Sequence, residues 1–170
     1  MKEIVITNRK LCTGDFMQQM EKALQSKPWG LLLREKDLCH NEYAALAAQA
    51  RPMCAAQGVQ FIAYPPHAGN FTHMPFAQAQ ALPQPFSVSV HSVEEAVQAQ
   101  AIGAAFVIAG HIFATQSKPG LPPRGLEFLR EVCASVDMPV FAIGGVTNEN
   151  AQDCLAAGAA GVCRMSHWFC

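Results

Sequence analysis

The 170-residue chain is long enough to bury one hydrophobic core and short for two domains, so a single domain over residues 1–170 is expected. A charged fraction of 15% and a net charge of −1 exclude a basic surface for nucleic acid, and a hydrophobic fraction of 51% argues against disorder. No apolar run approaches the ~18 residues of a membrane span and no signal-peptide core follows Met1, so we expect a cytoplasmic protein with a small-molecule partner.

Eight short apolar runs have the pattern of buried strands. In chain order they cover residues 3–7, 29–33, 59–63, 73–76, 86–90, 105–109, 139–143 and 161–165. Helical periodicity follows the first, second, fifth, sixth and seventh runs. Asp15 is expected to cap the first helix, Ser92 and Glu95 to form a capping box for the third, and Thr147 or Asn148 to cap the last.

This alternation of strands and helices predicts parallel pairing, and eight strands predict a compact (β/α)8 TIM barrel. Such barrels usually need ~250 residues. Because this chain is shorter, we expect several outer helices to be shortened or missing, namely those after the third, fourth and eighth strands; the five prolines in residues 64–86 agree with this for the third and fourth. An exposed flank would follow, and we expect a second copy of the chain, in a homodimer, to cover it.

The seven cysteines are scattered and contain no Cys-x-x-Cys pair. An odd number at such spacings argues against a zinc site and against a disulfide framework. We therefore expect most of the cysteines to be reduced and packed as small hydrophobic side chains.

The sixth strand ends at Gly110, and His111 follows it directly. In parallel α/β folds the carboxyl ends of the strands form the rim where ligands bind, so this imidazole is placed for chemistry. The loop after it contains Thr115, Ser117 and Lys118, which suit an anion, and then glycines and prolines that stiffen it into a flap. A lone histidine at a strand end is more often structural than catalytic, so the surrounding motif decides between the two interpretations.

Two stretches around this strand resemble the thiazole tautomerase branch of the thiamine phosphate synthase and TenI family. They are Gly110-His111-Ile112-Phe113, followed by Thr115 and Lys118, and the preceding Ser89-Val90-His91-Ser92-Val93-Glu94-Glu95-Ala96. In the synthases of that family a proline typically follows the strand-end glycine, whereas in the tautomerases the histidine there moves the proton. The resemblance implies a thiazole phosphate substrate and a catalytic role for His111.

The implied reaction is the aromatisation of a dihydrothiazole phosphate carboxylate by a proton shift. His111 would remove the ring proton next to the carboxylate and deliver a proton to the exocyclic alkene carbon, because imidazole groups take and return protons near neutral pH. Aromaticity supplies the driving force, so the resemblance implies no cofactor.

The resemblance also implies how the phosphate is held. Gly144 and Gly145 follow the seventh strand, and Ser166 follows the eighth. Backbone amides at these positions of a barrel commonly bind phosphate, and glycine lets the backbone come close to it. The chain departs from the family at His167, where a glycine is usual, and this ring is expected to narrow the phosphate pocket or to add a donor.

Further substrate contacts are implied at three other strand ends or loops. Arg34 and Lys36 belong to a Leu-Arg-Glu-Lys motif after the second strand, where arginine suits a carboxylate because it donates two parallel hydrogen bonds. A solvated charge run is the alternative for this pair. Lys118 matches a lysine that reaches the anion from the loop, and Ser89 is expected to present a hydroxyl at the rim, with His91 behind it.

Two other functions remain open. A thiamine phosphate synthase would join a pyrimidine pyrophosphate to the thiazole phosphate and use magnesium, held in the family by an Asn-Asp pair after the third strand and an aspartate after the fourth. This chain has Ala63-Tyr64 and Met74-Pro75-Phe76 in those regions, and no acidic residue between Glu42 and Glu94. A non-catalytic thiazole phosphate-binding barrel is the other alternative, favoured by the lost helices and His167.

Overall fold

The strands of the computed structural model, which describes residues 1–64, 69–79 and 85–169, form a closed barrel in chain order. Every strand pair with a described register is parallel. The strands are β1 (Lys2–Ile6), β2 (Gly30–Leu32), β3 (Gln60–Ala63), β4 (Phe71–Pro75), β5 (Phe86–Val90), β6 (Phe106–Gly110), β7 (Val140–Ile143) and β8 (Gly161–Arg164). The predicted (β/α)8 barrel is confirmed.

The helices of the described ranges are distributed unevenly along the chain. They are α1 (Phe16–Gln25), α2 (His40–Ala56), α3 (Val93–Ala101), α4 (Gly125–Ser135), α5 (Ala151–Ala156) and α6 (Ser166–Phe169), with 3-10 turns η1 (Arg9–Leu11) and η2 (Phe76–Gln78). Among the residues that the structure describes, no α-helix follows β3 or β4, and α6 after β8 is a single turn. The predicted shortening of the outer helices is thus confirmed for these segments.

The predicted helix starts agree with the structure at Asp15 and only in part at Ser92. The Asp15 side chain accepts the Gln18 N–H at 2.8 Å, as a capping residue should. Ser92 Oγ accepts the Glu95 N–H at 3.1 Å, but the Glu95 carboxylate binds the backbone N–H of His91 and not that of Ser92. The Glu95 carboxylate of this capping box therefore binds the residue before the cap, His91, in place of the cap residue itself.

The predicted cap of the helix after β7 is wrong, because α5 begins at Ala151 and its capping position is Asn150. Thr147 and Asn148 instead lie in a turn before the helix. The Asn150 side chain accepts the Thr147 N–H at 2.8 Å and donates to the Gly145 carbonyl at 2.9 Å. Its hydrogen bonds stabilise this turn, which carries the chain away from the end of β7.

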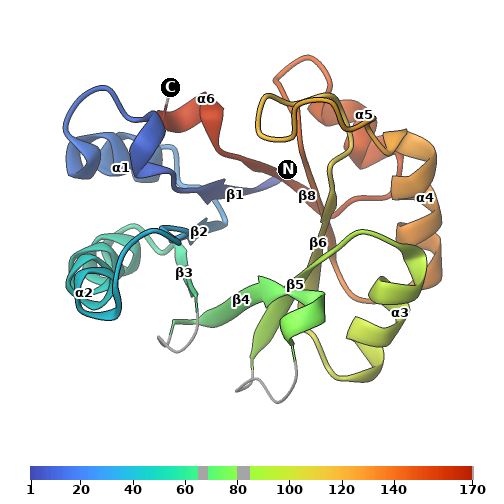
Figure 1. The fold of residues 1–170 in the computed structure, drawn as a ribbon, viewed down its shortest axis with the longest axis horizontal. Helices are drawn as coiled ribbons and strands as arrows, with labels where there is room; N and C mark the ends of the chain where they lie inside the picture. Colours follow the sequence, from blue (N-terminus) through green and yellow to red (C-terminus); the bar gives the residue numbers. More distant parts are fainter. Residues whose placement is uncertain (65–68, 80–84, 170) are drawn as a thin grey trace. The chain divides into compact units, whose positions relative to one another are not determined.

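The chain divides into two compact units, each with a core of its own. The N-terminal unit contains Glu3–His73 and Arg164–Cys170, and the C-terminal unit contains Met1–Lys2 and Met74–Cys163. In the N-terminal unit, α1 and α2 pack on the strands through buried residues that include Met20, Leu24, Leu31, Ala50 and Phe61. In the C-terminal unit, α3 and α4 lie beside β5 and β6 (Figure 1), and the core includes Val88, Val107, Leu129, Val132 and Ala142.

Three of the six described cysteines, Cys54, Cys154 and Cys163, are buried, as expected for thiols that pack as small hydrophobic side chains. Cys12 and Cys133 are half-buried, and Cys39 is exposed. Burial raises the pKa of the Cys54 thiol to about 12, so this side chain stays protonated and packs as an apolar group. None of the helices in the described ranges combines the length and the apolar character that a bilayer-spanning segment needs.

Candidate functional site

The centre of the candidate site is His111, which leaves β6 at its carboxyl end and is 7% exposed. Its Nε2 lies 3.4 Å from the carbonyl oxygen of Leu121. A carbonyl only accepts, so Nε2 is the protonated nitrogen of the neutral ring and Nδ1 carries the lone pair. Nδ1 is buried and has no hydrogen-bond partner among the residues that the structure describes. The imidazole is thus anchored through one nitrogen, and its other nitrogen has no hydrogen-bond partner among the described residues.

Gly144 and Gly145 lie directly against this histidine segment, as their order in the barrel predicts. The Ile112 N–H donates to the Ile143 carbonyl at 2.8 Å, and the Phe113 N–H donates to the Gly144 carbonyl at 2.9 Å. Gly144 has φ +100°, and a methyl group there would lie 2.3 Å from His111 Cβ. Glycine is required at this position both by the backbone conformation and by the close approach to His111.

The loop after His111 is closed at its base by two backbone hydrogen bonds. The Arg124 N–H donates to the His111 carbonyl and the Gly125 N–H donates to the Ile112 carbonyl, both at 3.0 Å. Within the loop, the Lys118 N–H donates to the Thr115 carbonyl at 3.1 Å. The loop is therefore a folded hairpin-like excursion that begins and ends beside β6.

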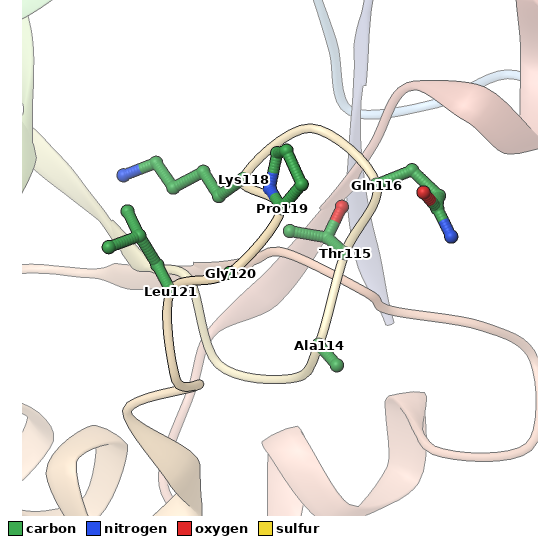
Figure 2. A pocket seen from close by; sticks show the side chains of 7 residues that line it. All are labelled: Ala114, Thr115, Gln116, Lys118, Pro119, Gly120 and Leu121. Atoms are coloured by element: carbon green, nitrogen blue, oxygen red, sulfur yellow. The ribbon is translucent and has the colours of Figure 1, made fainter.

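This loop lines an open pocket of about 420 Å³ (Figure 2). Its lining residues are Ala114, Thr115, Gln116, Lys118, Pro119, Gly120 and Leu121. Figure 2 shows the side chains of Lys118 and Gln116 pointing in opposite directions from the loop. His111 does not line this pocket; the loop contacts it through the Leu121 carbonyl. The predicted flap therefore contacts the His111 ring through a backbone carbonyl group.

The end of β5 contributes a second histidine next to the first. Ser89 is half-buried in β5, in register with Ile108 of β6. His91 follows the last residue of β5, and its Nδ1 lies 2.7 Å from the carbonyl oxygen of Gly110. The predicted place of His91 behind the rim agrees with this contact, which reaches the peptide group immediately before His111.

In the N-terminal unit, Arg34 and Lys36 follow β2 with their side chains exposed. Glu35 between them is 3% exposed, and its carboxylate accepts the Arg9 N–H at 3.0 and 3.1 Å. Because Glu35 points inward, its two cationic neighbours are directed to solvent. Lys36 Nζ lies 5.7 Å from the centre of the Tyr64 ring, and burial together with the Arg34 charge lowers the pKa of Lys36.

Ser166 lies elsewhere in the N-terminal unit, as the exposed first residue of α6. The ring of the adjacent His167 packs edge-on against Trp168, with 4.9 Å between the ring centres. The Trp168 indole N–H donates to Glu3 at 2.8 Å, and its carbonyl accepts the Gln19 side chain at 2.6 Å. His167, which departs from the family pattern, therefore packs beside a tryptophan whose ring and backbone carbonyl both form hydrogen bonds.

Sequence reasoning treated His73 only as the start of a strand, but the structure makes it a buried titratable residue. This β4 side chain is 6% exposed. Burial, and then the positive charges of Arg34 and Lys36, lower the pKa of His73 to about 3. The only sequence signal is a Thr-His pair inside an otherwise apolar strand.

Acid is expected to destabilise the fold through His73. In the unfolded chain this imidazole has the usual pKa of ~6.5, so between that pH and the folded value of about 3 the unfolded state binds a proton that the folded state lacks. The stability is present in full above pH ~6.5 and is lost toward pH ~3, with a slope of about 1.4 kcal/mol per pH unit.

Urea unfolding across this acid range measures the effect of His73. The slope of unfolding free energy against pH should be smaller in His73→Gln than in the unmodified protein by the contribution of one proton. His40→Gln, which changes an exposed histidine that is the first residue of α2, is the matched control for the substitution itself. Equal slopes in His73→Gln and the unmodified protein would contradict the assignment.

Comparison with known proteins gives one consistent family. The family model described as thiamine monophosphate synthase matches residues 3–64 and 66–167. A thiamine-phosphate synthase of Coprothermobacter proteolyticus is 31% identical, over 98% of this chain and 86% of that protein. A thiamine-phosphate synthase of Roseiflexus castenholzii is 34% identical, over 95% of this chain and 78% of that protein. The solved thiamine phosphate pyrophosphorylase of Pyrococcus furiosus superposes with a TM-score of 0.84 at 25% identity, over 97% of this chain and 85% of that one.

Proposed function

The chain belongs to the thiamine monophosphate synthase family of thiamine biosynthesis, and we propose that it is the thiazole phosphate carboxylate tautomerase of that chemistry. One observation carries the proposal: a buried histidine at the carboxyl end of β6 keeps Nδ1 without a partner among the described residues. Buried polar atoms without a hydrogen-bond partner are rare in folded proteins. A catalytic acid or base whose partner is the substrate would account for such an atom at His111.

His111 carries the proposed proton shift alone. Nδ1 removes the acidic ring proton next to the substrate carboxylate, and the C–H electron pair moves through the ring system to the exocyclic alkene carbon. The same nitrogen then gives a proton to that carbon, which leaves an aromatic thiazole and a neutral imidazole. The proton count balances, so the step as proposed consumes no co-reactant. The Leu121 carbonyl stabilises the ring while it is protonated, because it accepts from Nε2 throughout.

We assign the substrate contacts in the C-terminal unit to two backbone segments beside His111. Gly144 and Gly145, with φ of +100° and +63°, turn the backbone after β7 into a conformation that suits phosphate binding by amide groups. Thr115 and Lys118 offer a hydroxyl and an ammonium group from the loop pocket. An anion held by these groups would be anchored within the same unit as the imidazole.

The remaining assignments follow the family resemblance. Arg34 and Lys36 are assigned to anionic groups of the substrate, Ser166 to the phosphate, and Ser89 to a hydroxyl contact at the rim. The exposure of the two cations supports their part of this assignment, because Glu35 turns both of them outward. We propose that the protein works as a homodimer.

Thiamine-phosphate synthase activity is the second candidate, because the named relatives carry that name. That reaction needs magnesium for its pyrophosphate group, held by protein carboxylates together with phosphate oxygens. The residues present do not fit such a site. The described ranges hold no group of three or more His, Cys, Asp or Glu side chains that could bind a metal ion, and no acidic residue occurs between Glu42 and Glu94.

The two activities are separated by two assays of the purified protein. In the first, the dihydrothiazole phosphate carboxylate is added and the aromatic product is followed by proton NMR against the rate in buffer alone. In the second, pyrimidine pyrophosphate, thiazole phosphate and magnesium are added and thiamine phosphate is measured. We expect turnover in the first assay. Turnover in the second alone would establish the synthase, and turnover in neither would indicate a binding protein; both results contradict the tautomerase.

A further inference from the structure

We propose that His91 is a positioning residue for His111, acting through the carbonyl of Gly110. This inference rests on the proposed proton transfer at His111. His91 itself touches no reacting atom in it. Its role is to hold the peptide group from which the catalytic imidazole projects.

The contact that carries the inference joins the ends of two neighbouring strands. His91 Nδ1 lies 2.7 Å from the Gly110 carbonyl oxygen, a short distance for a bond of this type. Because the carbonyl can only accept, Nδ1 must be the protonated nitrogen of His91. The last described backbone pair between β5 and β6 is Val90 with Ala109. The imidazole of His91 therefore extends the pairing by one residue, up to the peptide that bears His111.

His91 is held in turn by the first turn of α3. Its backbone N–H donates to the Glu95 carboxylate, and Ser92 Oγ accepts the Glu95 N–H at 3.1 Å. The acidic side chain that would ordinarily complete the cap of this helix is directed to His91 instead. The helix start thus fixes the backbone of the residue whose ring fixes Gly110.

On the other side, β7 leaves no free space next to the same peptide. A methyl group at Gly110 would lie 2.3 Å from Ile143 Cγ2, and one at Gly144 would lie 2.3 Å from His111 Cβ. The backbone of Gly110 and His111 is therefore packed against β7 and hydrogen-bonded to His91 on the β5 side. Loss of the His91 donor would free the Gly110 peptide on the β5 side only. Misplacement of a catalytic group by about 1 Å can cost roughly 100-fold in rate.

Two substitutions of His91 separate the donor from the ring. The side-chain amide nitrogen of His91→Asn lies close to the position of Nδ1 and can still donate to Gly110, whereas His91→Leu fills the space without a donor. We expect His91→Leu to lower kcat at least roughly tenfold with KM changed by less than about twofold. We expect His91→Asn to restore most of kcat. His40→Leu, on the exposed start of α2, is the matched control.

A spectroscopic measurement tests the same inference without turnover. Long-range proton–nitrogen NMR in alkaline buffer, where imidazoles are neutral, should show His91 protonated at Nδ1. The ring resonances of His111 should shift in His91→Leu and stay in place in His91→Asn. Protonation of His91 at Nε2 would overturn the inference, even if His91→Leu failed to fold.

Equal kcat losses in the two variants, or unchanged kcat and His111 resonances in a folded His91→Leu protein, would also overturn it. Thermal unfolding of each variant shows whether it is folded. A wild-type protein without turnover would instead contradict the proposed function, and the NMR comparison would still decide the role of His91.

Discussion

Replacement of His111 with asparagine is expected to lower kcat for the tautomerase reaction by about 10²- to 10⁴-fold, the usual contribution of a general acid–base group. The amide of asparagine fills part of the same space and forms hydrogen bonds. It cannot take up and return a proton near neutral pH, however, so binding should survive while the chemistry is lost. Proton NMR of aromatic product formation measures the rate, and titration calorimetry with the aromatic product measures binding.

The matched control for this experiment is His40→Asn, which changes an exposed histidine at the start of α2 and should leave both measurements unchanged. Equal rates for His111→Asn and the unmodified protein would refute the assignment of the catalytic group. A loss of product binding together with the rate would mean that His111 anchors the ligand and does not act as the proton carrier.

Substitution of Gly144 by alanine is expected to destabilise the fold by roughly 2–6 kcal/mol, the sum of backbone strain and overpacking. The backbone has φ +100° at this position, which side-chain-bearing residues rarely adopt. The added methyl would also meet His111, at 2.3 Å from Cβ and 2.7 Å from Cα. Urea unfolding measures the free energy, and the melting temperature should fall by about 2–4 °C for each kcal/mol lost.

Alanine substitutions at two other glycines separate the cost of backbone strain from the cost of steric crowding. Gly58 has φ +69° with nothing within 4 Å of an added methyl, so Gly58→Ala should show the cost of strain alone. Gly14 has open space and no positive φ, so Gly14→Ala should be close to neutral. If Gly144→Ala lost no more stability than Gly58→Ala, the close approach to His111 would carry no energetic cost.

The barrel could be predicted because its strands are short apolar runs, several of which are followed or ended by a glycine or a charged residue. The prediction was less accurate where local chemistry was ambiguous. The fourth strand begins at Phe71, two residues before the predicted start, in a proline-rich region with a weak periodic signal. The helix after β7 begins at Ala151, and the Asn150 side chain binds the preceding turn, an arrangement that sequence alone does not reveal.

The candidate site divides in the same way. His111, Gly144 and the loop could be placed together from the sequence, since adjacent parallel strands end at the same rim. The inward direction of Glu35 and the low pKa of His73 could not, because both depend on how segments distant in sequence are buried and packed together. The same holds for the contact between His91 and Gly110, which requires knowledge of the register of β5 and β6.

Two backbone hydrogen bonds at the base of the 111–125 loop separate the stem, which carries His111, from the tip, which lines the pocket. Because His111 and Ile112 are bonded to Arg124 and Gly125, the stem is fixed whatever residues form the tip. Under the proposed function, substitutions among residues 115–120 would change the groups that the loop offers to a substrate, while the backbone of His111 keeps its hydrogen bond to Arg124. New substrate preferences could then arise from changes in this one loop.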